Sequence, residues 1–160
     1  MPSHLSAMKD LKFKEIIATL LVLLFAYTAA SKLLEHVRFL FQLRLSPLPQ
    51  VVAFAEVLSW SVPILETGIA VILTVGIITG HFLDKGLWVS LVLMASFETY
   101  ITAMFFSGKD LPCACGGIIS LMSWKGHMIF NGLTIILIIL TLIDFKRIRS
   151  KAAIKKYSRV

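Results

Sequence analysis

The only two cysteines in the chain, Cys113 and Cys115, are separated by a single residue. Pro112 precedes them and two glycines follow, which favours a tight turn because glycine accepts positive φ. Cysteines two positions apart can reach the Cα spacing of a disulfide, but so small a ring is strained. Strained, exposed disulfides exchange readily, and closing so short a loop adds little stability. The spacing therefore predicts thiol–disulfide exchange rather than a structural crosslink.

Two other interpretations of this segment stay open. The two thiolates together with Met122, His127 or Met128 could hold copper(I) or zinc, although the paired cysteine spacing usual for zinc is absent. Alternatively, both cysteines stay reduced and only pack in their loop. A disulfide-permissive compartment outside the membrane favours exchange. We therefore take Cys113 and Cys115 as the catalytic pair and expect no metal site.

The composition assigns these cysteines to a membrane protein. Of the 160 residues, 58% are hydrophobic and only 16% are charged, and the mean hydropathy is +0.86. Soluble domains average about 45–50% apolar and about 25% charged residues. With nine glycines, five prolines and two cysteines, a collagen-like chain and a disulfide-rich secreted scaffold are also excluded.

Four stretches are long and apolar enough to cross a bilayer as helices, which takes about 20 residues each. They lack strand-like alternation, so the sequence predicts an all-α, four-helix transmembrane bundle. The expected membrane domain covers residues 13–144, with spans at approximately residues 13–34, 50–78, 86–107 and 125–144. Outside these spans lie an N-terminal segment (residues 1–12), a Cys-x-Cys loop (residues 108–124) and a basic tail (residues 145–160).

The distribution of lysine and arginine predicts the orientation. The N-terminal residues up to Lys14, the loop between the second and third spans and the tail carry eleven of them, against five on the other side. Cytoplasmic loops carry the excess of positive charge, so both termini should be cytoplasmic. Two loops should then face outward, namely Leu33–Pro49 between the first two spans and the periplasmic Cys-x-Cys loop. The basic tail then serves as an anchor on anionic lipid rather than as a nucleic-acid site.

The first apolar run has a second interpretation. Its basic start and the small residues Thr28-Ala29-Ala30-Ser31 are also features of a signal peptide with a cleavage site. The run continues past this point into Leu33, so we favour a retained helix. Cleavage would leave the topology of the remaining spans unchanged.

Ionisable residues within the spans are the second group of residues that could take part in chemistry. Glu66 and Glu98 lie near mid-depth, where a charge is costly and therefore faces the bundle or a cavity. At helical spacing, His127 and Asn131 share one stripe of the fourth span. The pattern predicts an intramembrane pocket with Glu66, Glu98 and Asn131. The alternative, which we favour for the serines and threonines, is that these groups only join helices through interhelical hydrogen bonds.

His127 is one turn into the fourth span and close to the cysteine loop. Such a histidine could transfer a proton or raise the thiolate fraction of a cysteine. A purely structural hydrogen bond at the membrane interface is the competing explanation.

Several short motifs occur in a fixed order along the four spans. They are Ser31-Lys32-Leu33, Pro63-Ile64-Leu65-Glu66-Thr67-Gly68, Pro112-Cys113-Ala114-Cys115-Gly116-Gly117, and Trp124 with His127 and Asn131. In these features the chain resembles the MauE branch of the DoxX-like, redox-associated proteins of the bacterial inner membrane. The resemblance covers roughly residues 13–143 and leaves out the first residues and the tail.

The resemblance implies a multi-pass inner-membrane protein that handles thiols beside a periplasmic thioredoxin-like protein during protein maturation. The wider group includes quinone-linked oxidoreductase subunits, so a quinone is a candidate cofactor. With one cysteine pair, the chain must pass electrons to such a cofactor or be reset by a second protein. Whether it is itself a thiol–disulfide oxidoreductase stays open. The alternative is a non-enzymatic assembly factor, or a subunit of a membrane complex.

Overall fold

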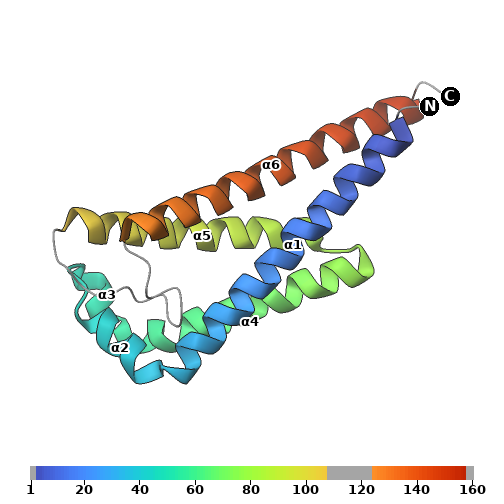
Figure 1. Cartoon of the computed structure of the whole chain (residues 1–160). Coiled ribbons are helices and arrows are strands. Elements are labelled where there is room, and N and C mark those ends of the chain that lie inside the picture. The colour runs from blue at the N-terminus through green and yellow to red at the C-terminus, as the bar shows by residue number, and fades with distance from the viewer. Residues whose placement is uncertain (1–2, 108–123, 158–160) are drawn as a thin grey trace.

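The computed structural model describes residues 3–107 and 124–157, with side chains described within residues 12–107 and 125–143. Every element in these ranges is a helix (Figure 1). In chain order they are α1 (Ser3–Leu34), α2 (His36–Arg44), α3 (Pro49–Ala53), α4 (Ala55–Thr79), α5 (Leu83–Phe106) and α6 (Trp124–Tyr157). The predicted all-α fold class is confirmed.

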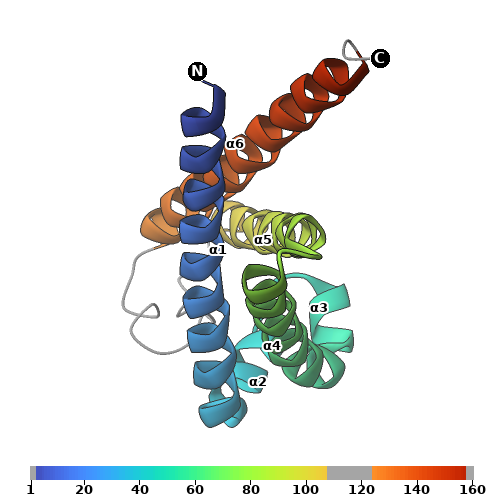
Figure 2. The same ribbon diagram turned by 90° about the vertical axis from the view of Figure 1, so that its right-hand side faces the viewer.

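Four of these helices have the length and hydropathy of membrane spans. The spans are Lys12–Leu34, Ala55–Thr79, Leu83–Phe106 and Lys125–Ile143. The start of α1 and the end of α6 lie at the same end of the bundle, beyond the turn between α4 and α5 (Figures 1 and 2). The chain is therefore a four-span membrane protein, in agreement with the expected multi-pass inner-membrane location.

The expected outer loop between the first two spans is largely helical. The predicted span at residues 50–78 is divided at Phe54 into α3 and α4, and α2 precedes them. Pro49 starts α3 because its fixed φ and missing N–H suit a first helical position. α2 is amphipathic and buries Phe39 and Leu43. Together α2 and α3 form a cap over the end of the bundle opposite the termini (Figure 1). We call α2 and α3 the outer cap.

The core is apolar and is built mainly where α1 packs on α4 and α5 on α6. Phe25, Leu73, Leu87 and Ile138 are among its most completely buried side chains. Many large apolar side chains on the same helices are exposed, for example Leu20, Ile64, Val92 and Leu140. In a bilayer such side chains face lipid, so this outer surface needs no protein partner.

The turn between α4 and α5 requires glycine at two positions. Gly80 ends α4 with φ of 69°, a conformation that costs glycine little. A Cβ on Gly76 would lie 2.9 Å from the backbone Cα of Leu83, so the start of α5 passes directly over this residue. An ion pair between Lys14 of α1 and Asp84 in the first turn of α5 holds the same end of the bundle together.

The hydroxyl groups of the spans bond mostly within their own helices. The hydroxyls of Thr67, Ser90 and Thr141 each donate to the carbonyl oxygen four residues earlier, at 2.7–2.8 Å. For these three hydroxyls, bonds within the helix replace the expected bonds between neighbouring helices. Each hydroxyl finds an acceptor within its own helix. The carbonyl oxygen four residues earlier lies within reach of the side chain, and its second lone pair can accept another hydrogen bond. Ser59 of α4, in contrast, also contacts His36 of α2.

Candidate functional site

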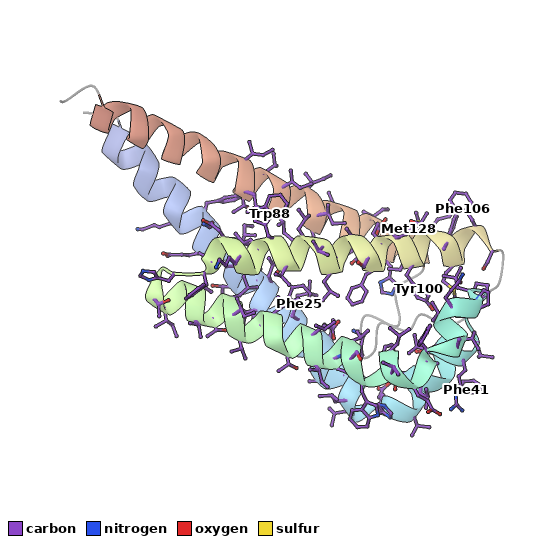
Figure 3. The ribbon with its side chains drawn as sticks, turned by 180° about the vertical axis from the view of Figure 1, so that it is seen from behind. Phe25, Phe41, Trp88, Tyr100, Phe106 and Met128 are labelled. Atoms are coloured by element: carbon purple, nitrogen blue, oxygen red, sulfur yellow. The ribbon has the colours of Figure 1, made fainter. Side chains whose placement is uncertain are left out.

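A cavity of about 350 Å³ lies inside the bundle, in the half that the outer cap covers. All six helices contribute to its wall, and most of the contributing side chains are apolar or aromatic. Phe25 from α1 and Tyr100 from α5 extend into the region between the helices (Figure 3). The polar groups in the wall are Thr28, Lys32, Glu66, Ser96, Tyr100, His127 and Asn131. The cavity is therefore apolar with a few polar groups, as is typical of small-molecule sites.

The strongest electrostatic feature of the wall is an ion pair between α1 and α4. Nζ of Lys32 donates to Oε1 of Glu66 over 2.6 Å. Lys32 is 5% exposed and Glu66 is completely buried. Burying either charge by itself would cost several kcal/mol. Each side chain offsets part of the cost of burying the other.

Aromatic rings surround the ammonium of Lys32. Nζ lies 5.8 Å from the ring centroid of Phe39 in α2 and 5.5 Å from that of Phe97 in α5. Both distances are within the range of cation–π attraction. Lys32 thus contacts the outer cap, α4 and α5 at once, and its position is determined by three different elements.

His127 and Asn131 supply the polar groups of α6. They are four residues apart on one helical face, and both are buried, with His127 only 1% exposed. Nε2 of His127 is buried and has no hydrogen-bond partner within the described residues. A buried polar atom without a partner is costly, and it marks a place where a bound molecule could supply one.

The outer cap is attached to α4 by polar contacts. Nε2 of His36 lies 3.1 Å from Oγ of Ser59, whose hydroxyl donates to the carbonyl oxygen of Glu56 over 2.7 Å. Because the hydroxyl proton is used there, Nε2 of His36 is the donor in the first contact. The ring of His36 also packs on Trp60, with centroids 4.3 Å apart. Arg44 adds an exposed ion pair with Glu56 at 2.7 Å. These contacts keep the cap over the cavity.

Of the residues expected to form an intramembrane pocket, some line the cavity and one does not. Glu66 and Asn131 line the cavity, as does His127. Glu98 is not part of this lining. It is half-buried on α5, and its Oε2 has no hydrogen-bond partner within the described residues. Cys113 and Cys115, the expected catalytic pair, lie outside the described residues.

Sequence reasoning did not single out Lys32 as a site residue, nor the aromatic side chains around it. Lys32 entered only as part of the motif Ser31-Lys32-Leu33, because a lysine at the end of an apolar run is usually an interfacial anchor. The signal that could have found it is charge balance. A carboxylate buried at mid-span needs a cation, and Lys32 is one of few within reach of the outer half of the bundle. In the described part of the chain, no group of three or more His, Cys, Asp or Glu side chains could hold a metal ion.

Comparison with known proteins agrees with this architecture. No curated protein and no solved structure matches the chain. A family model, described as methylamine utilisation protein MauE, matches residues 11–144. This match covers all four spans, the cavity and the cysteine segment. The chain belongs to the MauE family.

Proposed function

We propose that this protein carries out thiol–disulfide exchange at the outer side of the membrane, with Cys113 and Cys115 as the reacting pair. The location of the cavity supports the proposal. Ile101 near the end of α5 and His127 at the start of α6 both line it. These two helices flank residues 108–123, which carry both cysteines. The two helices that flank the cysteine segment in the sequence therefore both line a cavity with buried polar groups.

The exchange needs a thiol-bearing partner, and a thioredoxin-like protein has the required chemistry. A partner thiolate attacks one sulfur of the Cys113–Cys115 disulfide and forms a mixed disulfide, which releases the other cysteine as a thiolate. The second partner thiol then displaces the first cysteine. The partner gains a disulfide, and the pair becomes two thiols that carry two electrons and two protons. Return to the disulfide requires an acceptor for both.

His127 fits the proton side of this cycle. It is buried at the start of α6, three residues after the helix begins. A histidine can donate or accept a proton near neutral pH. In this proposal it transfers protons between the reduced cysteine pair and the cavity.

The redox state of the two cysteines in intact membranes tests the proposal. Cells are quenched with acid, free thiols are labelled with a mass-shifting maleimide, and the bands are compared before and after depletion of electron acceptors. Purified thioredoxin lacking its resolving cysteine serves as the trap for a mixed disulfide. We expect a disulfide that responds to acceptor supply, and an adduct formed when the single thiol of this thioredoxin attacks the Cys113–Cys115 disulfide of the unaltered protein. The variants Cys113→Ser and Cys115→Ser have no internal disulfide to attack and should form no adduct. The double variant is the control that forms none.

A second candidate function follows from the family description, which refers to methylamine utilisation. In this case the chain assists the maturation of a protein of that process without chemistry of its own. Cys113→Ser and Cys115→Ser would then leave partner complexes and the maturation phenotype intact. Thiols that stay reduced under all conditions and form no adduct would refute exchange in favour of this assembly role.

A further inference from the structure

The size and walls of the cavity restrict what it can hold. Its volume of about 350 Å³ is within the range of roughly 300–1,000 Å³ found for small-molecule sites. Five aromatic side chains contribute to the wall, namely Phe25, Phe39, Phe97, Tyr100 and Phe130. Aromatic rings pack well against other flat rings, by offset stacking or edge to face. The walls favour a planar ring over a flexible chain.

The cavity also reaches the lipid-facing surface of the bundle. Leu65 and Phe130 line it, yet they are 53% and 38% exposed. Both belong to membrane spans. A ligand can therefore enter from the bilayer, which selects for lipid-soluble molecules.

The charge balance of the wall selects against anions. The ammonium of Lys32 is already neutralised by Glu66 at 2.6 Å, with both side chains buried. Among residues 12–107 and 125–143, no other lysine, arginine, aspartate or glutamate lines the cavity. An anionic ligand would lose its hydration and find no uncompensated cation, which costs several kcal/mol in a low-dielectric site. Without Glu66, the same lysine would attract such a ligand.

The polar groups in the wall nevertheless favour a ligand that carries a polar atom. Nε2 of His127 is buried in it without a hydrogen-bond partner among the described residues. The amide of Asn131 lies one turn further along the same face. A hydrocarbon ring would leave Nε2 of His127 without a bond, whereas a carbonyl oxygen on a ring can accept from Nε2–H or from the amide of Asn131.

We infer that the cavity binds the uncharged ring of a lipid-soluble quinone, and that Glu66 makes it reject anionic rings of the same size. The role of the quinone as electron acceptor rests on the proposed exchange, but the binding of the quinone in the cavity does not. Electrons and protons balance in this step: oxidation of two thiols to one disulfide releases two electrons and two protons, and reduction of a quinone to a quinol takes up two of each. His127 holds one carbonyl oxygen by a hydrogen bond, and the Lys32–Glu66 pair keeps the site neutral.

Equilibrium dialysis of the full chain in lipid nanodiscs tests the inference, with empty nanodiscs to subtract partition into lipid. Three probes share one ring size: 2-methyl-1,4-naphthoquinone, 2-methylnaphthalene and 2-naphthoate. The protein is the double variant Cys113→Ser/Cys115→Ser, so no thiol can react with the quinone. We expect saturable binding of the quinone with a Kd at least about tenfold below those of both other probes, as for one hydrogen bond or one avoided charge.

Variants then separate the contributions of the wall. Glu66→Gln should raise the affinity for 2-naphthoate at least about tenfold, because Lys32 becomes an uncompensated cation. His127→Leu should weaken quinone binding about tenfold and leave 2-methylnaphthalene unchanged. Leu58→Trp fills the cavity and should abolish binding. Leu140→Trp, on the lipid-facing side, is its matched control.

The relative affinities of the three probes for the protein with an intact cavity test the inference even if a variant fails to fold. Equal binding of the quinone and 2-methylnaphthalene, tighter binding of 2-naphthoate, or quinone binding that survives Leu58→Trp would overturn the inference. Thiol exchange without quinone binding would leave the proposed function standing and refute this site. Quinone binding together with cysteines that show no redox change would support this site and refute the proposed thiol–disulfide exchange.

Discussion

Lys32 in α1 and Glu66 in α4 are 34 residues apart in sequence and form an ion pair of 2.6 Å inside the bundle. The other buried lysine, Lys14, pairs with an aspartate whose side chain is 35% exposed. The Lys32–Glu66 pair is therefore the most deeply buried ion pair in the described ranges. Its position in the cavity wall links the packing of α1 on α4 to the chemistry of the site.

Removing one member of this pair should destabilise the protein more than removing both. Lys32→Met leaves a buried carboxylate without its cation, and Glu66→Leu leaves a buried ammonium. Each should cost about 3–5 kcal/mol, whereas the double variant Lys32→Met/Glu66→Leu should recover most of the loss. Unfolding by denaturant titration in detergent micelles measures the difference.

The exposed pair of Arg44 and Glu56 provides the control, with side chains 53% and 76% exposed. Arg44→Ala should change stability by about 1 kcal/mol or less. A double variant at Lys32 and Glu66 that is as unstable as the sum of the singles would show that the pair contributes through packing rather than through charge.

Adding one methyl group at Gly76 should disturb the turn between α4 and α5. A Cβ there would lie 2.9 Å and 3.0 Å from backbone atoms of Leu83, which cannot move without shifting the start of α5. We expect Gly76→Ala to lose about 1–3 kcal/mol, as for overpacked cores, and to lower Tm. Gly68→Ala is the matched control, since a Cβ at Gly68 meets nothing within 4 Å. Equal Tm values for the two variants would contradict the close approach.

Loss of His127 should slow the oxidation of the cysteine pair without unfolding the protein. A positioned acid or base contributes about 10²-fold or more to such a step, so His127→Leu should slow disulfide formation by at least that factor. Stopped-flow mixing of the reduced protein with an oxidant, followed by quenching with maleimide, gives the rate. His81→Leu changes an exposed histidine in the turn after α4 and should leave the rate unaltered. A rate that survives loss of His127 would assign this residue a structural role.

The orientation in the membrane follows from the basic residues and can be measured directly. The start of α1 and the end of α6 lie at one end of the bundle, and the tail carries seven lysines and arginines. We expect this end in the cytoplasm, because basic segments are retained there. A fluorescent protein fused to the C-terminus should be bright, and alkaline phosphatase at the same position inactive. The opposite pair of results would place the cysteines in the cytoplasm, where a stable disulfide is rare.

The four spans and their inward faces could be predicted from the sequence because both are local properties. Length and hydropathy define a span, and helical periodicity alone places Glu66 and Ser59, or His127 and Asn131, on one face. Those four side chains are all buried in the structure. The cysteine pair is a local pattern too, since only its spacing and its neighbours enter the argument.

Pairing between helices could not be predicted, because it depends on how each helix is rotated and where its neighbours cross. α5 presents Phe97, Tyr100 and Ile101 to the cavity, so Glu98 lies outside the lining although it is equally deep in the sequence pattern. Lys32 looked like an interfacial anchor, but the crossing of α1 and α4 brings it to Glu66. The segment expected as an outer loop folds into the outer cap, which contributes Phe39, Leu43 and Val51 to the cavity wall. Hydropathy decided which segments enter the membrane, and tertiary packing decided which charges meet there, because only packing determines distances between residues far apart in the chain.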